Sequence, residues 1–300
     1  MRVALEAVPD GVYESEWTAD GLGRPITLRA RLKVAGSDIH ISFPEAPPQV
    51  EVGAFNCTLS YVRGHVNYAL KCILGPEVPT NEGCFRPIHV SAPEGSLFNA
   101  RRPAAVDMRT RIGWQIHPLI FKALAEVLPG RVLAGCGQPA LVSLDGEWRD
   151  GRRFQEHLLL GAGLGAGREM DGESNSTFPS SAASTSIEVF EQRSPLLVER
   201  RELARESAGA GRRRGGYAER ISVRMRPETG RWFRLVVALE RMTVAPYGLE
   251  GGLEGTRSQI ERWRGGVTMD TAERVIEVND SAESVSVTTA GGGGYGAGTS

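Results

Sequence analysis

The sequence predicts a mixed α/β protein of the α+β class, with an antiparallel hairpin and helices in its N-terminal half and a β-rich C-terminal half. Three observations carry this prediction. Apolar residues alternate with polar ones between Ile26 and Phe43, two runs follow the helical period between residues 60 and 127, and short β-prone runs recur after Leu196. With 300 residues and 41% hydrophobic content, the chain can bury enough surface for one large or two ordinary domains.

The first element is an expected hairpin. Apolar side chains from Ile26 to Val34 alternate with Thr, Arg and Lys, and Gly36 lies in a short turn. In the following run, Ile39, Ile41 and Phe43 share one face. This pattern predicts a half-buried antiparallel pair of strands.

Two helices are expected next. The apolar positions from Val62 to Ile73 recur at helical spacing, with Ser60 as the expected N-cap and Gly75-Pro76 as the stop. A second helical pattern runs from Ile112 to Val127. Pro118 lies inside it, so the proline either kinks one helix or occupies the first turn of another.

The remaining chain is expected to divide into a loop and a β-rich part. The predicted domains are residues 1–160, a Gly/Ser-rich loop at 161–186 that stays mobile until it meets a partner, and residues 187–300. The loop begins with a glycine pattern that formally fits a dinucleotide fingerprint, but no helix follows it, so we do not predict a nucleotide site. Candidate strands in the β-rich part are residues 196–203, 217–225, 232–239, 274–278 and 284–289.

Charge and cysteine content exclude several classes of function. Thirty-five Lys+Arg against 36 Asp+Glu leave a net charge of −1, so we expect no nucleic-acid partner and no anionic membrane partner. No apolar run approaches the roughly 20 residues that span a bilayer. The four cysteines and five histidines form no close metal-binding pair, so we expect no metal on this chain. Together with the absence of an apolar leader at Met1, this predicts a cytoplasmic protein.

Two segments carry a family resemblance. Residues 81–99 read NEGCFRPIHVSAPEGSLFN, and residues 291–296 read GGGGYG. Both resemble the hydantoinase B/oxoprolinase family, and further motifs follow in that family's order along the whole chain. These are Pro103 to Val106, Ile187 to Glu191, Gly209-Ala210-Gly211, Arg214-Gly215-Gly216 and Pro246 to Gly252.

The resemblance implies a function shared between polypeptides. The chain is similar to the C-terminal half of the large subunit of an ATP-dependent cyclic-amide hydrolase of the hydantoinase or 5-oxoprolinase type. It would be inactive without an N-terminal half on another polypeptide and a hydantoinase A-type ATPase subunit. ATP and Mg would bind the ATPase subunit, and a divalent metal would bind the N-terminal half. The alternatives are a subunit of an ATP-dependent, biotin-independent ketone carboxylase, a non-catalytic scaffold or assembly subunit, and a gene fragment.

Three residues of the first motif are candidates for contact with substrate or with a partner, and no catalytic role is assigned. Asn81 offers both a donor and an acceptor. Arg86 follows Glu82 by four residues, a spacing that allows a partly buried ion pair acting as a structural clamp or as a substrate contact. Among the 37 glycines, Gly83, Gly95 and Gly211 are expected in turns with positive φ.

Overall fold

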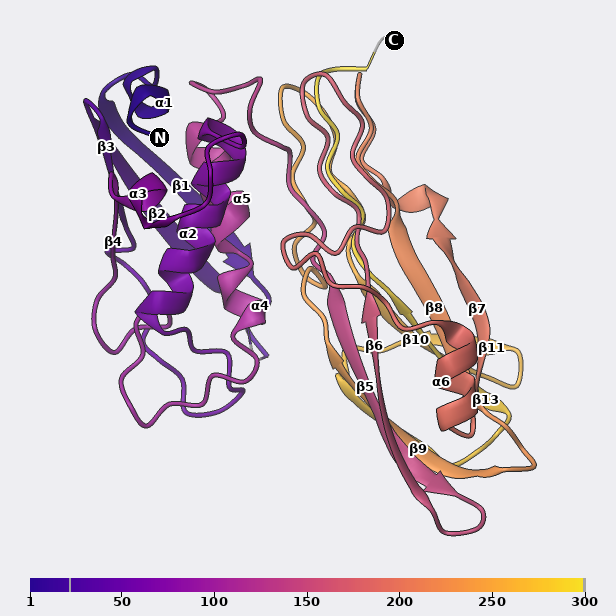
Figure 1. Ribbon diagram of the computed structural model, residues 1–300. Helices are drawn as coiled ribbons and strands as arrows, with labels where there is room; N and C mark the ends of the chain where they lie inside the picture. Colours follow the sequence, from indigo (N-terminus) through magenta and orange to yellow (C-terminus); the bar gives the residue numbers. More distant parts are fainter. Residues whose placement is uncertain (22, 299–300) are drawn as a thin grey trace. The chain divides into compact units, whose positions relative to one another are not determined.

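The computed structural model describes residues 1–21 and 23–298, and the chain forms two compact units (Figure 1). Unit 1 comprises Met1–Leu133 with Gly167–Glu169, and unit 2 comprises Ala134–Ala166 with Met170–Ser300. The mixed α/β, β-rich class is therefore confirmed. The division lies between residues 133 and 134 and not at the predicted 160, because the strand at residues 140–148 pairs with the strand at residues 230–238.

Unit 1 is built on a sheet with strand order β1-β2-β3-β4, here called sheet A. The predicted hairpin is confirmed as β2 and β3, which pair antiparallel with Val34 opposite Ile39. We did not predict β1, whose sequence alternates less clearly because Gly11 and Ser15, two of its inward positions, are not apolar. The edge strand β4 pairs parallel to β3. The bounds are β1 Gly11–Ala19, β2 Ile26–Ala35, β3 Asp38–Ser42 and β4 Ile88–Ser91.

Helices cover the apolar face of sheet A. The long helix α2 begins after Thr58, whose hydroxyl accepts a hydrogen bond from the Tyr61 backbone N–H at 3.3 Å, so the cap lies two residues before the predicted Ser60. Pro118 lies in the first turn of α5, where a missing N–H costs no hydrogen bond. Buried Val66 of α2 and Leu119 of α5 belong to the core beneath the sheet. The helices are α1 Arg2–Glu6, α2 Leu59–Leu74, α3 Glu82–Phe85, α4 Thr110–Gly113 and α5 Ile116–Leu124.

Unit 2 contains two antiparallel sheets whose apolar side chains form one core. Sheet B has the order β11-β10-β13-β8-β7, and sheet C has the order β12-β9-β5-β6. Phe233 of sheet C and Val285 of sheet B are both fully buried in this core, and Phe190 of the short helix α6 joins them. The bounds are β5 Ala140–Trp148, β6 Arg153–Leu160, α6 Ile187–Arg193, β7 Leu196–Ala204, η1 Arg205–Ser207, β8 Ala218–Met225, β9 Gly230–Ala238, β10 Gln259–Arg264, β11 Val267–Asp270, β12 Val275–Val278 and β13 Glu283–Thr288.

The five predicted strands of unit 2 are confirmed as β7, β8, β9, β12 and β13, with ends shifted by a few residues at most. Four strands, β5, β6, β10 and β11, were not predicted. In β5, Gly146 weakens the strand signal, but a Cβ there would lie 2.3 Å from the Trp232 carbonyl oxygen, so the glycine allows β9 to approach closely.

A glycine-rich bundle extends from the sheets of unit 2. We define it by the extended segments 134–137, 161–166, 172–176, 207–217, 246–256 and 290–296, several of which run side by side without strand arrows in Figure 1. Residues 291–296 are buried, and they donate backbone hydrogen bonds to different neighbours in turn. Gly292 and Tyr295 donate to the carbonyls of Gly216 and Arg213, whereas Gly291 and Gly294 donate to those of Thr256 and Leu253.

Residues that donate to the same neighbouring segment are three positions apart, as Gly291 and Gly294 are. This period is typical of polyproline II chains, which have three residues per turn and no internal hydrogen bonds. The bundle needs glycine because its chains touch backbone to backbone. A Cβ on Gly292 would lie 2.0 Å from the Leu164 carbonyl oxygen, and one on Gly216 would lie 1.8 Å from that of Glu173. Residues 161–166 therefore form part of this bundle, whereas the sequence suggested a mobile loop.

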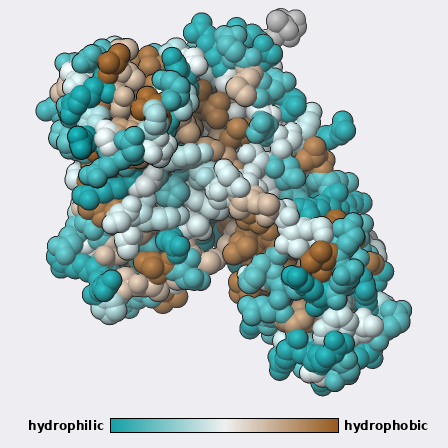
Figure 2. Space-filling model, viewed as in Figure 1, coloured by the Kyte–Doolittle hydropathy of each residue, from teal (hydrophilic) through white to brown (hydrophobic). Residues whose placement is uncertain are grey.

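Polar side chains cover most of the visible surface of each unit, and brown apolar residues occur mainly in small groups (Figure 2). Within the described ranges, none of the helices has the length and apolar character that crossing a membrane requires.

Candidate functional sites

The predicted site residues lie at the start of α3 in unit 1. Asn81 is the N-cap, and its Oδ1 accepts a hydrogen bond from the Cys84 backbone N–H at 3.1 Å. Glu82 and Arg86 are exposed, and neither takes part in an ion pair within the part of the chain that the structure describes. The expected partly buried pair is therefore wrong, because the short helix turns Cys84 inward and leaves both charged side chains in solvent. Their role as substrate or interface contacts stays a prediction.

The end of the first motif, residues 93–99, is a turn that carries two apolar side chains. Gly95 has a φ of +79°, as predicted, and its N–H donates to the Asn99 carbonyl at 2.8 Å. The Ser96 hydroxyl donates to the Pro93 carbonyl at 2.6 Å. The turn places Leu97 and Phe98 in the core with no exposed surface. This motif therefore specifies a local fold.

The other two glycine predictions were wrong. Gly83 lies in helix α3, and Gly211 lies in the glycine-rich bundle without positive φ. A Cβ on Gly211 would lie 2.8 Å from the Gly296 carbonyl oxygen, so close approach and not backbone conformation requires glycine there.

A histidine and tyrosine cluster joins α2 to α5. His65 contacts the rings of Tyr61 and His117 edge-on, with centroid distances of 4.5 Å and 5.0 Å. Tyr68, one turn further along α2, contacts His117 at 5.5 Å. Burial lowers the pKa of His65 to about 4 and the pKa of His117 to about 3. Both rings are thus neutral at physiological pH.

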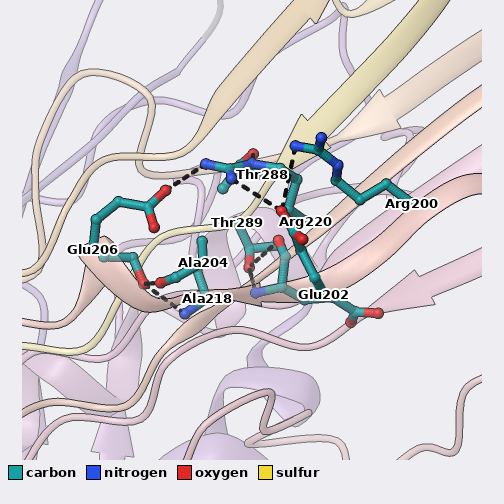
Figure 3. A network of polar contacts seen from close by, with 10 residues as sticks. Arg200, Glu202, Ala204, Glu206, Ala218, Arg220, Thr288 and Thr289 are labelled. Atoms are coloured by element: carbon teal, nitrogen blue, oxygen red, sulfur yellow. Dashed lines mark hydrogen bonds and ion pairs between the residues drawn. The ribbon is translucent and has the colours of Figure 1, made fainter.

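The outer face of sheet B carries a polar network (Figure 3). At its centre, the Arg220 guanidinium donates to the Thr288 hydroxyl at 3.1 Å, to Glu202 at 3.3 Å and to Glu206 at 2.5 Å. Arg200 reaches the same Glu202 oxygen at 3.4 Å. These side chains come from β7, β8, β13 and η1, so the network links strands across most of the sheet.

A second polar network connects sheet B to the glycine-rich bundle. Glu219 of β8 is almost fully buried and accepts hydrogen bonds from Arg201 Nε at 2.6 Å and from the Gly161 backbone N–H at 2.7 Å. The Thr289 hydroxyl donates a hydrogen bond to the Gly161 carbonyl at 2.7 Å. The same hydroxyl accepts a hydrogen bond from the Glu219 backbone N–H at 3.1 Å. Sequence reasoning missed both networks because their members are separated by up to 128 residues.

The described residues offer no metal centre, since no group of three or more His, Cys, Asp or Glu among them is arranged to hold an ion. Asp38 and His89, which lie on neighbouring strands, contact each other at 3.1 Å, but Asp38 also pairs with Arg2 at 2.5 Å. The Arg2 and His89 contacts hold the pKa of the Asp38 carboxyl below its usual value. The donor set present here therefore does not fit the divalent metal that the resemblance implies for the enzyme.

Comparison with known proteins places the chain in a family. The family model described as hydantoinase B/oxoprolinase matches residues 1–298. The chain belongs to this family. The motifs that suggested it, from Gly209 to Gly216 and from Pro246 to Gly252, meet residues 291–296 in the glycine-rich bundle. In this hydantoinase B/oxoprolinase chain the glycines of these motifs thus allow the backbones of the bundle to contact one another.

Individual hydantoinase B relatives support the assignment. The chain is 30% identical to the caprolactamase subunit beta of Pseudomonas jessenii over 74% of its own length and 40% of that subunit. The crystal structure of ATP-dependent caprolactamase from the same organism matches with a TM-score of 0.83 and 24% identity, covering 99% of this chain and 53% of that one. An acetone carboxylase structure matches with a TM-score of 0.81 and 14% identity, covering 98% and 47%. The two structures show that the fold is shared.

The chain is shorter than these relatives. It spans 47% and 22% of the lengths of two further curated relatives, an uncharacterized protein of Methanocaldococcus jannaschii and a 5-oxoprolinase of Pestalotiopsis fici. The hydantoinase B/oxoprolinase match therefore covers this chain almost completely but covers only part of each relative.

Proposed function

We propose that this chain forms the C-terminal part of the large subunit of an ATP-dependent cyclic-amide hydrolase of the hydantoinase or 5-oxoprolinase type. The observation that carries the proposal is the family match over residues 1–298. A relative named caprolactamase subunit beta supports cyclic-amide hydrolysis and a shared assembly, since its name implies at least one other subunit.

The proposed chemistry is divided between polypeptides. A hydantoinase A-type ATPase subunit would bind ATP and Mg, and a polypeptide carrying the N-terminal half of the large subunit would bind the divalent metal. This chain would bind neither cofactor and would be inactive alone, supplying contacts to the assembled enzyme. The proposed compartment is the cytoplasm, where the free thiols of its cysteines would stay reduced.

The test is reconstitution. We would coexpress the chain with an ATPase subunit and an N-terminal half from neighbouring genes, purify the complex and measure ATP hydrolysis with hydantoin, 5-oxoproline and caprolactam. The expected result is ATP hydrolysis that depends on one of these amides and yields its ring-opened product. Stimulation only by a ketone with bicarbonate would replace the proposal with the carboxylase alternative. A stable complex that no substrate stimulates would favour the scaffold.

Variants of Asn81 separate its capping role from contact with substrate or partner. Asn81→Ala removes the N-cap and should destabilise unit 1 by roughly 0.5–2 kcal/mol. Asn81→Ser keeps a capping oxygen, so its stability should be near that of the parent chain. If turnover of the complex falls in both variants, the amide makes a functional contact. If the complex and its turnover are unchanged in both, Asn81 is only a cap.

Glu82 and Arg86 allow a simpler test, because both are exposed and unpaired in the described structure. Glu82→Gln and Arg86→Gln should leave the free energy of unfolding within about 0.5 kcal/mol of the parent value. A tenfold loss of turnover or of subunit affinity would then identify a contact with substrate or partner. Unchanged values in both assays would remove these residues from the candidate site.

A further inference from the structure

A trough lies on the outer face of sheet B. Its floor consists of Ser222 on β8 with Ser284 and Ser286 on β13, two adjacent interior strands of the sheet. Ser222 and Ser286 are directly opposite each other and share a hydrogen bond between their hydroxyls. Small side chains therefore line the middle of this face, and longer ones stand on the strands at either side.

The trough has two walls of different chemistry. Glu199 and Arg200 rise from β7 on one side, and Glu261 and Trp263 rise from β10 on the other. The trough is open to solvent, and its volume of about 590 Å³ is within the usual range for sites that take small molecules. This hollow follows from the strand register, because Arg200 is opposite Ser222, Ser286 is opposite Glu261, and Ser284 is opposite Trp263.

The charges in the trough are balanced and already partnered in part. Glu199 pairs with Arg224 at 2.7 Å, and Arg220 is held by Glu202 and Glu206. The lining contains two arginines and two glutamates, so the trough presents no net charge to a ligand. A strongly ionic ligand would have to displace existing ion pairs, which disfavours an anion or a cation.

The groups that can recognise a ligand are hydroxyls and an indole, with Ser222 and Ser284 at the bottom of the trough only 8% and 7% exposed. Each serine hydroxyl has one donor and two acceptor positions, so hydrogen-bonding capacity remains after the Ser222–Ser286 bond. Trp263 is 45% exposed, so its indole is accessible to a ligand. A flat apolar ring beside hydroxyl, carboxylate and guanidinium groups matches a ligand that has an apolar face of C–H groups and a rim of hydroxyls.

We propose that this trough binds a neutral, hydroxyl-rich ligand of the saccharide class, with the Trp263 indole stacking on a sugar ring and the serine floor hydrogen-bonding its hydroxyls. The proposal does not rest on the proposed amide hydrolysis, since sheet B of this chain supplies every lining residue. It requires neither ATP nor a partner subunit.

The test uses the full chain and defined probes. Isothermal titration and ligand-observed saturation-transfer NMR would be run with maltotriose, cellotriose and N,N′,N″-triacetylchitotriose at millimolar concentrations. We expect saturable binding of at least one trisaccharide and saturation transfer to its ring protons. Absence of binding by all three in both measurements would overturn the proposal.

Variants locate the site. Trp263→Ala should weaken binding at least tenfold, Trp263→Phe should weaken it less, and Ser286→Val should weaken it because it removes a floor hydroxyl. Val275→Ala is the control, since Val275 is 55% exposed on β12 in the other sheet, and it should leave binding unchanged. Circular dichroism would verify that each variant folds. Binding that survives both Trp263→Ala and Ser286→Val would place the ligand elsewhere and contradict the proposal.

Discussion

Glu219 and Arg201 form a nearly buried ion pair, with the Arg201 Nε 2.6 Å from Glu219 Oε1 and the Glu219 side chain only 2% exposed. The second carboxylate oxygen accepts the N–H of Gly161, where the chain leaves β6 and enters the glycine-rich bundle. One side chain thus joins β7, β8 and the start of the bundle.

Glu219→Ala should destabilise the protein by roughly 3–5 kcal/mol, because it leaves Arg201 Nε and the Gly161 N–H without their acceptor in a largely buried place, although Arg201 keeps its contacts to Thr185 and Ser184. Urea unfolding measures the change. Glu202→Ala is the matched control, since Glu202 also pairs with arginine but its side chain is 43% exposed. It should cost at most about 1 kcal/mol. Equal losses in the two variants would show that burial does not strengthen the Glu219 contacts.

Gly292→Ala should disrupt the glycine-rich bundle. The added Cβ would lie 2.0 Å from the Leu164 carbonyl oxygen, and backbone atoms on both sides have to move to admit it. We expect a loss of about 3 kcal/mol or more in the free energy of unfolding. Gly64→Ala is the control, because Gly64 lies inside α2 with open space around it. Alanine favours the helix there, so this variant should raise the free energy of unfolding by roughly 0.5–1 kcal/mol. A Gly292→Ala protein of parental stability would contradict the backbone packing described for the bundle.

The stability of the protein should fall as the solution becomes acidic. Burial lowers the pKa of His65 from 6.5 to about 4, so the unfolded chain takes up a proton more readily than the folded one. The free energy of unfolding is unaffected by protonation of this histidine above about pH 6.5 and decreases as the pH falls from there toward about 4. At about pH 5 the loss is on the order of 2 kcal/mol for this histidine, and His117 acts in the same direction.

The measurement is urea unfolding at about pH 7.5 and about pH 5. His65→Gln should reduce the difference in stability between the two conditions. His157→Gln, which removes an exposed imidazole on β6, should leave that difference as it is in the parent chain. If His65→Gln retains the full difference, other groups cause the acid sensitivity.

Asn56 has a structural role that a substitution should reveal. Its buried amide accepts the Val50 N–H at 2.8 Å and donates to the carbonyls of Val50 at 2.8 Å and Ala105 at 3.0 Å. Asn56→Asp replaces the donating nitrogen with an oxygen that faces two carbonyl oxygens. We expect a loss of roughly 1–3 kcal/mol or more at neutral pH. Thermal unfolding of Asn56→Asp beside Asn81→Asp, which changes an exposed cap, tests this, and similar midpoints in the two variants would argue against it.

The candidate sites were only partly predictable. Asn81 was identified from its motif, but its capping role depends on the conformation of the next four residues. The trough on sheet B could not be inferred, although the alternation of Ser284, Ser286 and Thr288 was visible in the sequence. Its shape depends on which residues of β7 and β10 lie opposite that strand, and strand register is set by long-range pairing.

The sequence by itself determined the class of fold, the hairpin at β2 and β3, the positions of α2 and α5, and the family. The helices and the hairpin follow from local periodicity, which needs only a short stretch of sequence. The family follows from the order of short motifs along the chain. Only the tertiary structure decided why the glycines are needed, where the units divide, and which charged groups are buried. Those properties depend on backbones and side chains far apart in the sequence that approach within a few ångströms, as Gly292 approaches Leu164 and Gly161 approaches Glu219.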